Sequence, residues 1–169
     1  MSYIGAIILV ISALYIGVSK AREERCKVKT LRELCSALDI LKNEICTNRT
    51  PIGKVISMQR LNSFEAINGF FSILGNEFEN LGDRRFADIW SECIEQALGI
   101  LPDKSKTELI ALGNSIGRYD SELQKQAIER CSNALQSECE ALESVLINNE
   151  KMYIGLSGGA GAILALMLV

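Results

Sequence analysis

The sequence contains no histidine, only two prolines, and no Cys-x-x-Cys pair among its six cysteines. Histidine is the side chain that enzymes use most often as a general base, and zinc sites are built from clustered cysteine and histidine ligands. The sequence also has no serine or cysteine in a nucleophile-elbow pattern and no acidic metal-binding loop. We therefore expect no enzymatic activity, no cofactor and no metal, and a function in binding or scaffolding.

Charge is missing from both ends of the chain. Residues 1–19 and 152–169 contain no Asp, Glu, Lys or Arg, so all 18 basic and 21 acidic residues lie between Lys20 and Lys151. The net charge of −3 gives no reason to expect nucleic acid as a partner. A polar central segment thus lies between two uncharged ends.

Each uncharged end is long enough to cross a bilayer as a helix. At about 1.5 Å per residue, each end approaches the roughly 30 Å thickness of the hydrocarbon core. A cleaved signal peptide fits the first end poorly, because no basic residue precedes the apolar run and no clear Ala-x-Ala site follows it. We predict transmembrane helices over 1–19 and 152–169 and one domain over 20–151. A buried core helix is the alternative for the C-terminal end.

Glycine is concentrated in the C-terminal end, which reads IGLSGGAGAILALMLV. A phosphate-binding loop would need a lysine after the glycines, and none follows them. Membrane helices instead use small residues four positions apart to approach one another closely, as Gly155 with Gly159 and Gly158 with Ala162 would allow. We predict a helix-packing face at these positions, with the N-terminal span as its partner.

Basic residues border both predicted spans on the side of the central segment. A run of lysines and arginines follows the first span between 20 and 29, and Lys151 precedes the second. Positive residues next to membrane spans stay on the cytoplasmic side. We therefore expect a cytoplasmic central domain, both termini on the opposite side of the cell membrane, and membrane lipid among the partners. Cysteines on apolar helix faces are then expected to be reduced core thiols rather than a disulfide framework.

Helical periodicity runs through the central segment. Apolar residues recur at spacings of three and four, beginning with Leu31, Leu34, Leu38, Leu41 and Ile45. Proline, glycine and capping signals divide the segment into helices that run to about 46, from 51, from about 62, over about 83–101, over about 105–117, and from about 120 into the C-terminal end.

Two of these helix starts depend on a capping-box spacing, Asn62 with Glu65 and Ser105 with Glu108. The predicted fold is all-α. It is an antiparallel bundle of about six helices around one apolar core, whose first and last helices continue as the N- and C-terminal transmembrane helices.

Three stretches of the chain resemble motifs of one protein family. LKNEICTNRTPIGKVI is similar to the family's L-x-x-E-I stretch followed by T-P-[LI], and LGNSIGRYDSELQKQAI is similar to its L-G-x-x-x-G-x-x-D-x-x-x-Q segment. NNEKMYIGLSGGAGAILALMLV is similar to its basic junction, K-M-x-x-x-L-[GS], and its last span. With the first span these stretches cover essentially the whole chain in order. The chain therefore resembles the stage III sporulation protein AB family of endospore-forming bacteria.

The resemblance implies a helical domain similar to the F-type platform domain of type II secretion systems, which sits in the inner membrane and contacts a cytoplasmic secretion ATPase. The implied role is a non-enzymatic platform in the sporulation channel complex, in the mother-cell membrane facing the forespore. The implied partners are the ATPase and other membrane channel subunits. Ser157 stands where the family has glycine, which shifts the small face of the last span. The alternatives are a general membrane-tethered helical adaptor unrelated to sporulation and a secreted, disulfide-linked bundle.

The family motifs match six positions at two expected helix corners: Glu44, Pro51, Gly113, Gly117, Asp120 and Gln124. One interpretation is that all six cap helices or allow tight packing, which is the role we expect for Pro51 and the two glycines. The other is that Glu44, Asp120 and Gln124 belong to an acidic surface that contacts the ATPase. In that case charge reversal at Glu44 or Asp120 would abolish partner binding and leave the helical content intact.

Overall fold

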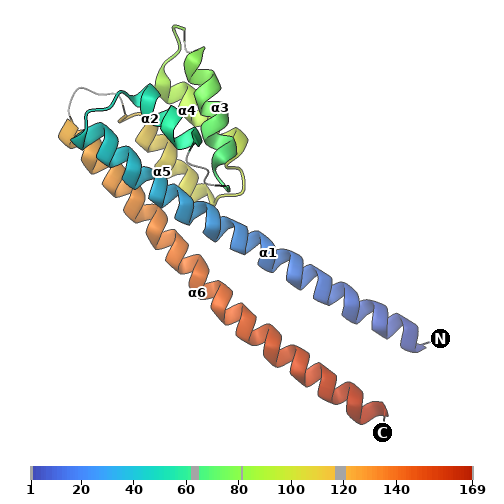
Figure 1. Ribbon diagram of the computed structural model, residues 1–169. Helices are drawn as coiled ribbons and strands as arrows, with labels where there is room; N and C mark the ends of the chain where they lie inside the picture. The colour runs from blue at the N-terminus through green and yellow to red at the C-terminus, as the bar shows by residue number, and fades with distance from the viewer. Residues whose placement is uncertain (1, 62–64, 81, 117–120, 169) are drawn as a thin grey trace. The chain divides into compact units, whose positions relative to one another are not determined.

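The structure is a computed structural model that describes the backbone of residues 2–61, 65–80, 82–116 and 121–168, and their side chains except at 2–14, 16–18, 21 and 149–168. These backbone ranges form helices and turns and contain no strand. In chain order the helices are α1 (Ser2–Lys42), the short π-helix η1 (Asn43–Thr47), α2 (Ile52–Leu61), α3 (Asn68–Glu79), α4 (Phe86–Ala97), α5 (Asp103–Gly113) and α6 (Ser121–Leu168) (Figure 1). The prediction of an all-helical fold with six α-helices is confirmed.

The chain divides into two compact units. The larger, which we call the helical unit, comprises Cys26–Cys139, and the other comprises Met1–Arg25 with Glu140–Val169. The helical unit therefore contains η1 and α2 to α5 together with parts of α1 and α6. The predicted domain, 20–151, encloses this unit.

The uncharged ends of the chain continue α1 and α6 as helix from Ser2 and to Leu168. Within the part of the chain whose side chains are described, no helix has both the length and the apolar character needed to cross a membrane. The two predicted spans lie mostly outside those side chains, so the transmembrane helices stay a prediction.

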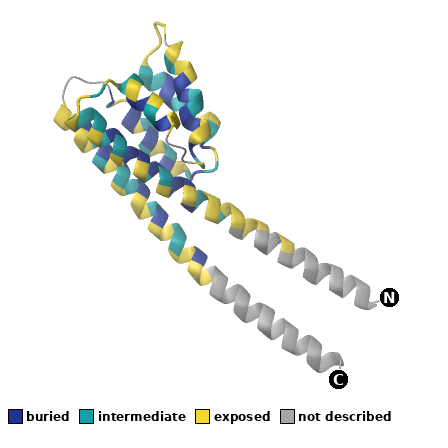
Figure 2. Ribbon diagram, in the orientation of Figure 1, coloured by how far each residue is buried: buried dark blue, intermediate teal, exposed yellow. Residues whose placement is uncertain are grey.

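The core of the helical unit is built from the apolar faces that the periodicity indicates. Leu31, Leu34, Leu38 and Leu41 on α1 are each at most 3 % exposed, while Ile45 is half-buried because it lies in η1, where the helix changes pitch. Buried side chains are concentrated in this unit, as the dark blue segments show (Figure 2). The predicted α1 seam is confirmed for its four leucines.

Aromatic rings pack at the centre of α3 and α4. Phe70 lies edge-on to Phe71 and to Trp90, with ring centroids 5.0 and 5.2 Å apart, and Phe86 lies 5.6 Å from Trp90. Edge-to-face pairs of this kind place the positive ring edge against the negative ring face. The rings thus form part of the core rather than a binding groove.

The start of α3 differs from the capping-box prediction. The helix begins at Asn68, and Glu65 does not cap it, because the Glu65 carboxylate accepts a hydrogen bond from Lys29 of α1. A second α1 side chain, Glu33, accepts the backbone N–H of Ala66 through Oε2 at 2.8 Å. Residues 65–67 form a turn that these contacts tie to α1, and α3 begins only after it, so the predicted start near 62 was wrong. Asn62 itself lies outside the described residues.

The start of α5 differs in the opposite direction and lies earlier than predicted. Pro102, at φ −56°, precedes a helix that begins at Asp103, so Ser105 lies inside the first turn rather than at the cap. The Ser105 hydroxyl is buried and has no hydrogen-bond partner among the described residues. Pro102 is the N-cap, and its carbonyl oxygen accepts the backbone N–H of Lys106 at 3.1 Å, so the helix starts before the Ser105 signal is reached.

α4 is shorter than predicted at both ends. The turn that precedes it contains Gly82, with φ +53°, and delays the start of the helix to Phe86, while Leu98 caps its C-terminal end.

Candidate functional site

The first corner predicted from the family motifs lies at η1. The Glu44 carboxylate accepts hydrogen bonds from Asn48 Nδ2 at 3.0 Å and from Thr50 Oγ1 at 2.7 Å. The backbone closes the same turn, because Thr50 N donates to the Glu44 carbonyl oxygen at 2.8 Å. Glu44 is half-buried, and both carboxylate oxygens are engaged within the corner. These contacts favour the capping interpretation of this residue.

Pro51 follows the corner and opens α2. Its carbonyl oxygen accepts the backbone N–H groups of Lys54 at 2.9 Å and Val55 at 3.2 Å, while its ring is exposed. Proline suits this position because its fixed φ matches a helix start and its missing N–H would have no partner there.

The second corner contains a close approach between α5 and α4. Gly113 is buried, and a Cβ at this position would lie 2.8 Å from Trp90 Cγ and closer still to Cδ1. The indole is held in place by a hydrogen bond of 2.7 Å from its Nε1 to the carbonyl oxygen of Leu109. Only glycine fits beside the ring in this position, which explains the residue in physical terms.

Of the other predicted residues of the second corner, the structure describes only Gln124. Gly117 and Asp120 lie outside the described residues. Gln124 is on α6 and only 7 % exposed, so its side chain is part of the interior and not of an open surface. The predicted packing face of the predicted last span, at Gly155, Gly158, Gly159 and Ala162, lies on α6 outside the described side chains and stays a prediction.

All six cysteines belong to the helical unit, and their burial differs. All six are free, and Cys93, Cys131 and Cys139 are buried, whereas Cys26 is exposed. Burial raises the pKa of Cys93 to about 11 and that of Cys131 to about 12. Because the thiolate is the reactive form, these two thiols are poor nucleophiles at neutral pH. Among the described residues, no group of His, Cys, Asp or Glu side chains is arranged to hold a metal ion.

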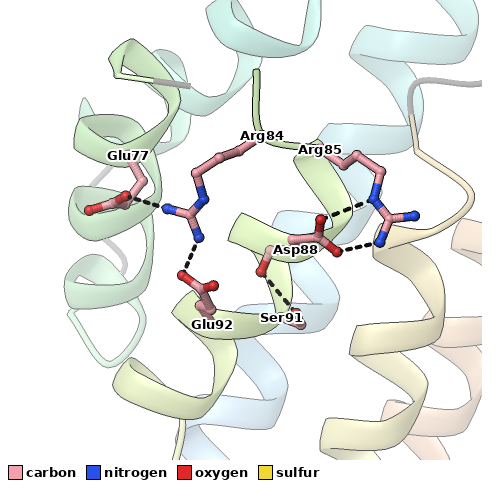
Figure 3. A network of polar contacts seen from close by, with 6 residues as sticks. All are labelled: Glu77, Arg84, Arg85, Asp88, Ser91 and Glu92. Carbon is pink, nitrogen blue, oxygen red and sulfur yellow. Dashed lines mark hydrogen bonds and ion pairs between the residues drawn. The ribbon is translucent and has the colours of Figure 1, made fainter. Parts of the chain in front are cut away.

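A charged network between α3 and α4 was not anticipated from the sequence (Figure 3). Arg84 joins Glu77 at 3.4 Å and also contacts Glu92, while Arg85 binds Asp88 through two hydrogen bonds of 2.7 and 3.0 Å. The hydrogen bonds from Arg85 hold the pKa of Asp88 below its usual range. Only the Arg85–Asp88 pair has a helical spacing that the sequence could have indicated, since the Arg84 contacts depend on the turn at Gly82.

Comparison with known proteins gives a consistent result. The family model described as Stage III sporulation protein AB matches residues 2–169. Stage III sporulation protein AB from Bacillus subtilis (strain 168) is 23 % identical over 171 residues, which covers 100 % of this chain and 99 % of that protein.

A solved structure of a Stage III sporulation protein AB superposes with a TM-score of 0.65 at 18 % identity. It covers 72 % of this chain and 97 % of the solved chain, which shows that the fold is shared. The family match extends over nearly the entire sequence. The chain therefore belongs to the stage III sporulation protein AB family.

Proposed function

We propose that this protein is a non-enzymatic platform of the sporulation channel complex between mother cell and forespore. In this proposal its uncharged ends anchor it in the mother-cell membrane facing the forespore, and the helical unit lies in the cytoplasm. There it binds a secretion-type ATPase, while the anchored helices contact other channel subunits. Membership of the family supports the role in sporulation.

The observation that carries the membrane part of the proposal is the continuity of the first and last helices. α1 and α6 are helices of 41 and 48 residues, and each runs without a break from the helical unit into an uncharged end of the chain. Such a helix would couple an anchored end directly to the helical unit, as a platform requires. The small residues of the last span would pack against the first span, where Gly5 and Gly17 offer small surfaces.

The contact with the ATPase needs a surface that is open to a partner. Glu44 is hydrogen-bonded within its own corner and Gln124 is buried, so neither side chain is open to direct contact with the ATPase. Asp120 remains a candidate from the family motif. Charge reversal at Glu44 would also break the corner, so Glu44→Gln, which keeps one acceptor oxygen, is the better probe of this interface.

Cysteine labelling in intact cells tests the topology. The reporter is Cys26, because its thiol is exposed, and Cys26→Ser is the control for its signal. A second reporter is a cysteine added after Val169. Protection of Cys26 from an impermeant maleimide, with labelling of the added cysteine, is the expected result. Labelling of Cys26 from outside would place the helical unit on the other side of the membrane and remove the ATPase contact.

The same samples address the secreted alternative. A secreted, disulfide-linked bundle would lose its first residues and yield oxidised cysteines, both of which intact-mass measurement detects. An adaptor unrelated to sporulation is not favoured, because the family match covers residues 2–169.

A further inference from the structure

Six lysines and arginines in the described part of the helical unit form an ion pair with a carboxylate inside it. Ion pairs join Lys29 to Glu65, Lys42 to Glu129, Arg84 to Glu92, Arg85 to Asp88, Lys104 to Glu138 and Lys106 to Asp103. Five other described cations of this unit form no ion pair with a described residue. Two of them, Lys125 and Arg130, are on α6, and the other three are Arg49, Lys54 and Arg60. These three cations lie within twelve positions of one another on the η1 corner and α2.

Two of the three cations lie on one exposed side of α2, and Arg49 is exposed at the corner that precedes this helix. On α2, Lys54, Ser57 and Arg60 recur at a spacing of three, which places them on one side of the helix, and all are exposed. The opposite side carries the buried residues of α2. Leu61, at the end of the same helix, is 80 % exposed. We call the surface formed by Arg49, Lys54, Ser57, Arg60 and Leu61 the α2 face.

The described residues do not neutralise the charges of this face. Arg49 has a positive φ of 54°, which is uncommon for a residue with a side chain and is imposed here by the closed turn around Glu44. Glu44 is the acid nearest to Arg49 in sequence, yet its oxygens bond Asn48 and Thr50. Arg60 donates to the neutral Asn76 Oδ1 at 3.3 Å.

We propose that the α2 face is a docking surface for an acidic segment of a partner protein. The carboxylates of that segment pair with Arg49, Lys54 and Arg60, since a guanidinium matches a carboxylate with two parallel hydrogen bonds. An apolar side chain of the same segment covers Leu61. This apolar end favours a protein over a bare polyanion such as nucleic acid.

The inference names a surface and the chemistry of its occupant, and it depends neither on the membrane anchors nor on the ATPase as the partner. The chain offers matched control positions. Lys125 and Arg130 on α6 are also exposed cations without an ion pair to a described residue, and Ala111 is an exposed neutral position on α5.

The test is site-specific photocrosslinking with the full-length chain in spore-forming cells. A photoreactive residue replaces Ser57, and the same residue at Ala111 is the positional control. Mass spectrometry of the adducts should map the Ser57 crosslink to an Asp- and Glu-rich segment of another protein. The triple variant R49E/K54E/R60E should lose most of this adduct, and K125E/R130E should retain it. Lysines introduced at the partner's carboxylates should restore the adduct with the triple variant.

Folding is controlled by far-UV circular dichroism. If the reversed variant does not fold, the neutral variant R49Q/K54Q/R60Q replaces it, with the same expected loss. An adduct that maps to lipid, nucleic acid, a second copy of this chain or a segment without acidic residues would overturn the proposal. Equal yields at Ser57 and Ala111, no adduct at Ser57, or an adduct that survives both triple variants would also overturn it. An acidic partner other than the ATPase would support the α2 face and would leave the proposed ATPase contact unaffected.

Discussion

Replacement of Gly113 by alanine tests the packing of α5 against α4 most directly. The added Cβ would lie 2.8 Å from Trp90 Cγ and 3.1 Å from Nε1, both well inside normal carbon contact distances. The ring has little freedom to retreat, because Phe70 and Phe86 lie 5.2 and 5.6 Å from it, centroid to centroid. Either the backbone of α5 moves or the indole gives up its hydrogen bond to Leu109.

The expected magnitude follows from these two responses. Overpacking of a core costs about 1–3 kcal/mol, and loss of a buried hydrogen bond leaves a desolvated group that costs about 1–3 kcal/mol. Alanine recovers up to about 1 kcal/mol through its better helix propensity, and less than that here because Gly113 is the last residue of α5. We expect Gly113→Ala to lower the free energy of unfolding by about 1–3 kcal/mol.

Urea unfolding of the full-length chain, followed by fluorescence, measures this loss. Trp90 is the only tryptophan, so its emission reports on the perturbed site itself. The matched control is Gly69→Ala on α3, where no atom lies within 4 Å of the added Cβ. That variant should be neutral or more stable by up to about 1 kcal/mol. The double variant G113A/W90F should lose less stability than the sum of its single variants, because the smaller ring removes part of the clash.

Two results would refute the reasoning. An unfolding midpoint of Gly113→Ala equal to that of the wild type would mean that α4 and α5 do not approach as closely as described. An equal loss in Gly69→Ala would show that the effect belongs to glycine in a helix and not to the contact with Trp90.

Three further predictions concern the corner, the charged network and the thiols. Glu44→Ala should lower stability in thermal unfolding by about 1–2 kcal/mol, because two donors lose their acceptor, and Glu44→Gln should lose less; equal losses would contradict this. Arg85 lowers the pKa of Asp88, so the pair stabilises the fold at neutral pH and that contribution disappears as acid protonates the carboxylate. Arg85→Gln should raise this pKa toward its ordinary value in a carboxyl NMR titration, and an unchanged value would exclude the pairing. Burial raises the pKa of Cys131 to about 12, so a thiol reagent should modify Cys26 rapidly and Cys131 only on unfolding, unless α6 opens locally.

The sequence predicted burial correctly where apolar residues recur at regular spacing along one helix. The α1 leucines at spacings of three and four are buried because a helix with 3.6 residues per turn must place them on one side. The start of α3 was predicted too early because the turn at 65–67 is tied to α1, which is distant in sequence: Lys29 donates to Glu65, and Glu33 accepts the N–H of Ala66. The start of α5 was wrong because Pro102 is already the N-cap before Ser105 is reached.

In the candidate site too, the features set by residues close in sequence could be predicted, and those set by distant residues could not. Glu44 and Pro51 could be assigned to a corner because their partners lie within six positions along the chain. That Gln124 is buried was not evident, since it depends on how α6 packs within the helical unit. The α2 face was missed as well, because whether a lysine or arginine has an acidic partner is decided by residues that are distant in sequence.

By itself, the sequence determined the all-helical class, the uncharged ends and the membership of the stage III sporulation protein AB family, since composition, periodicity and motif order are properties of the chain alone. Only the tertiary structure decided that Gly113 must remain small beside Trp90 and that Glu44 is engaged within its corner. It also decided that Arg49, Lys54 and Arg60 remain without ion pairs to described residues. These outcomes depend on distances between segments that helical periodicity does not encode.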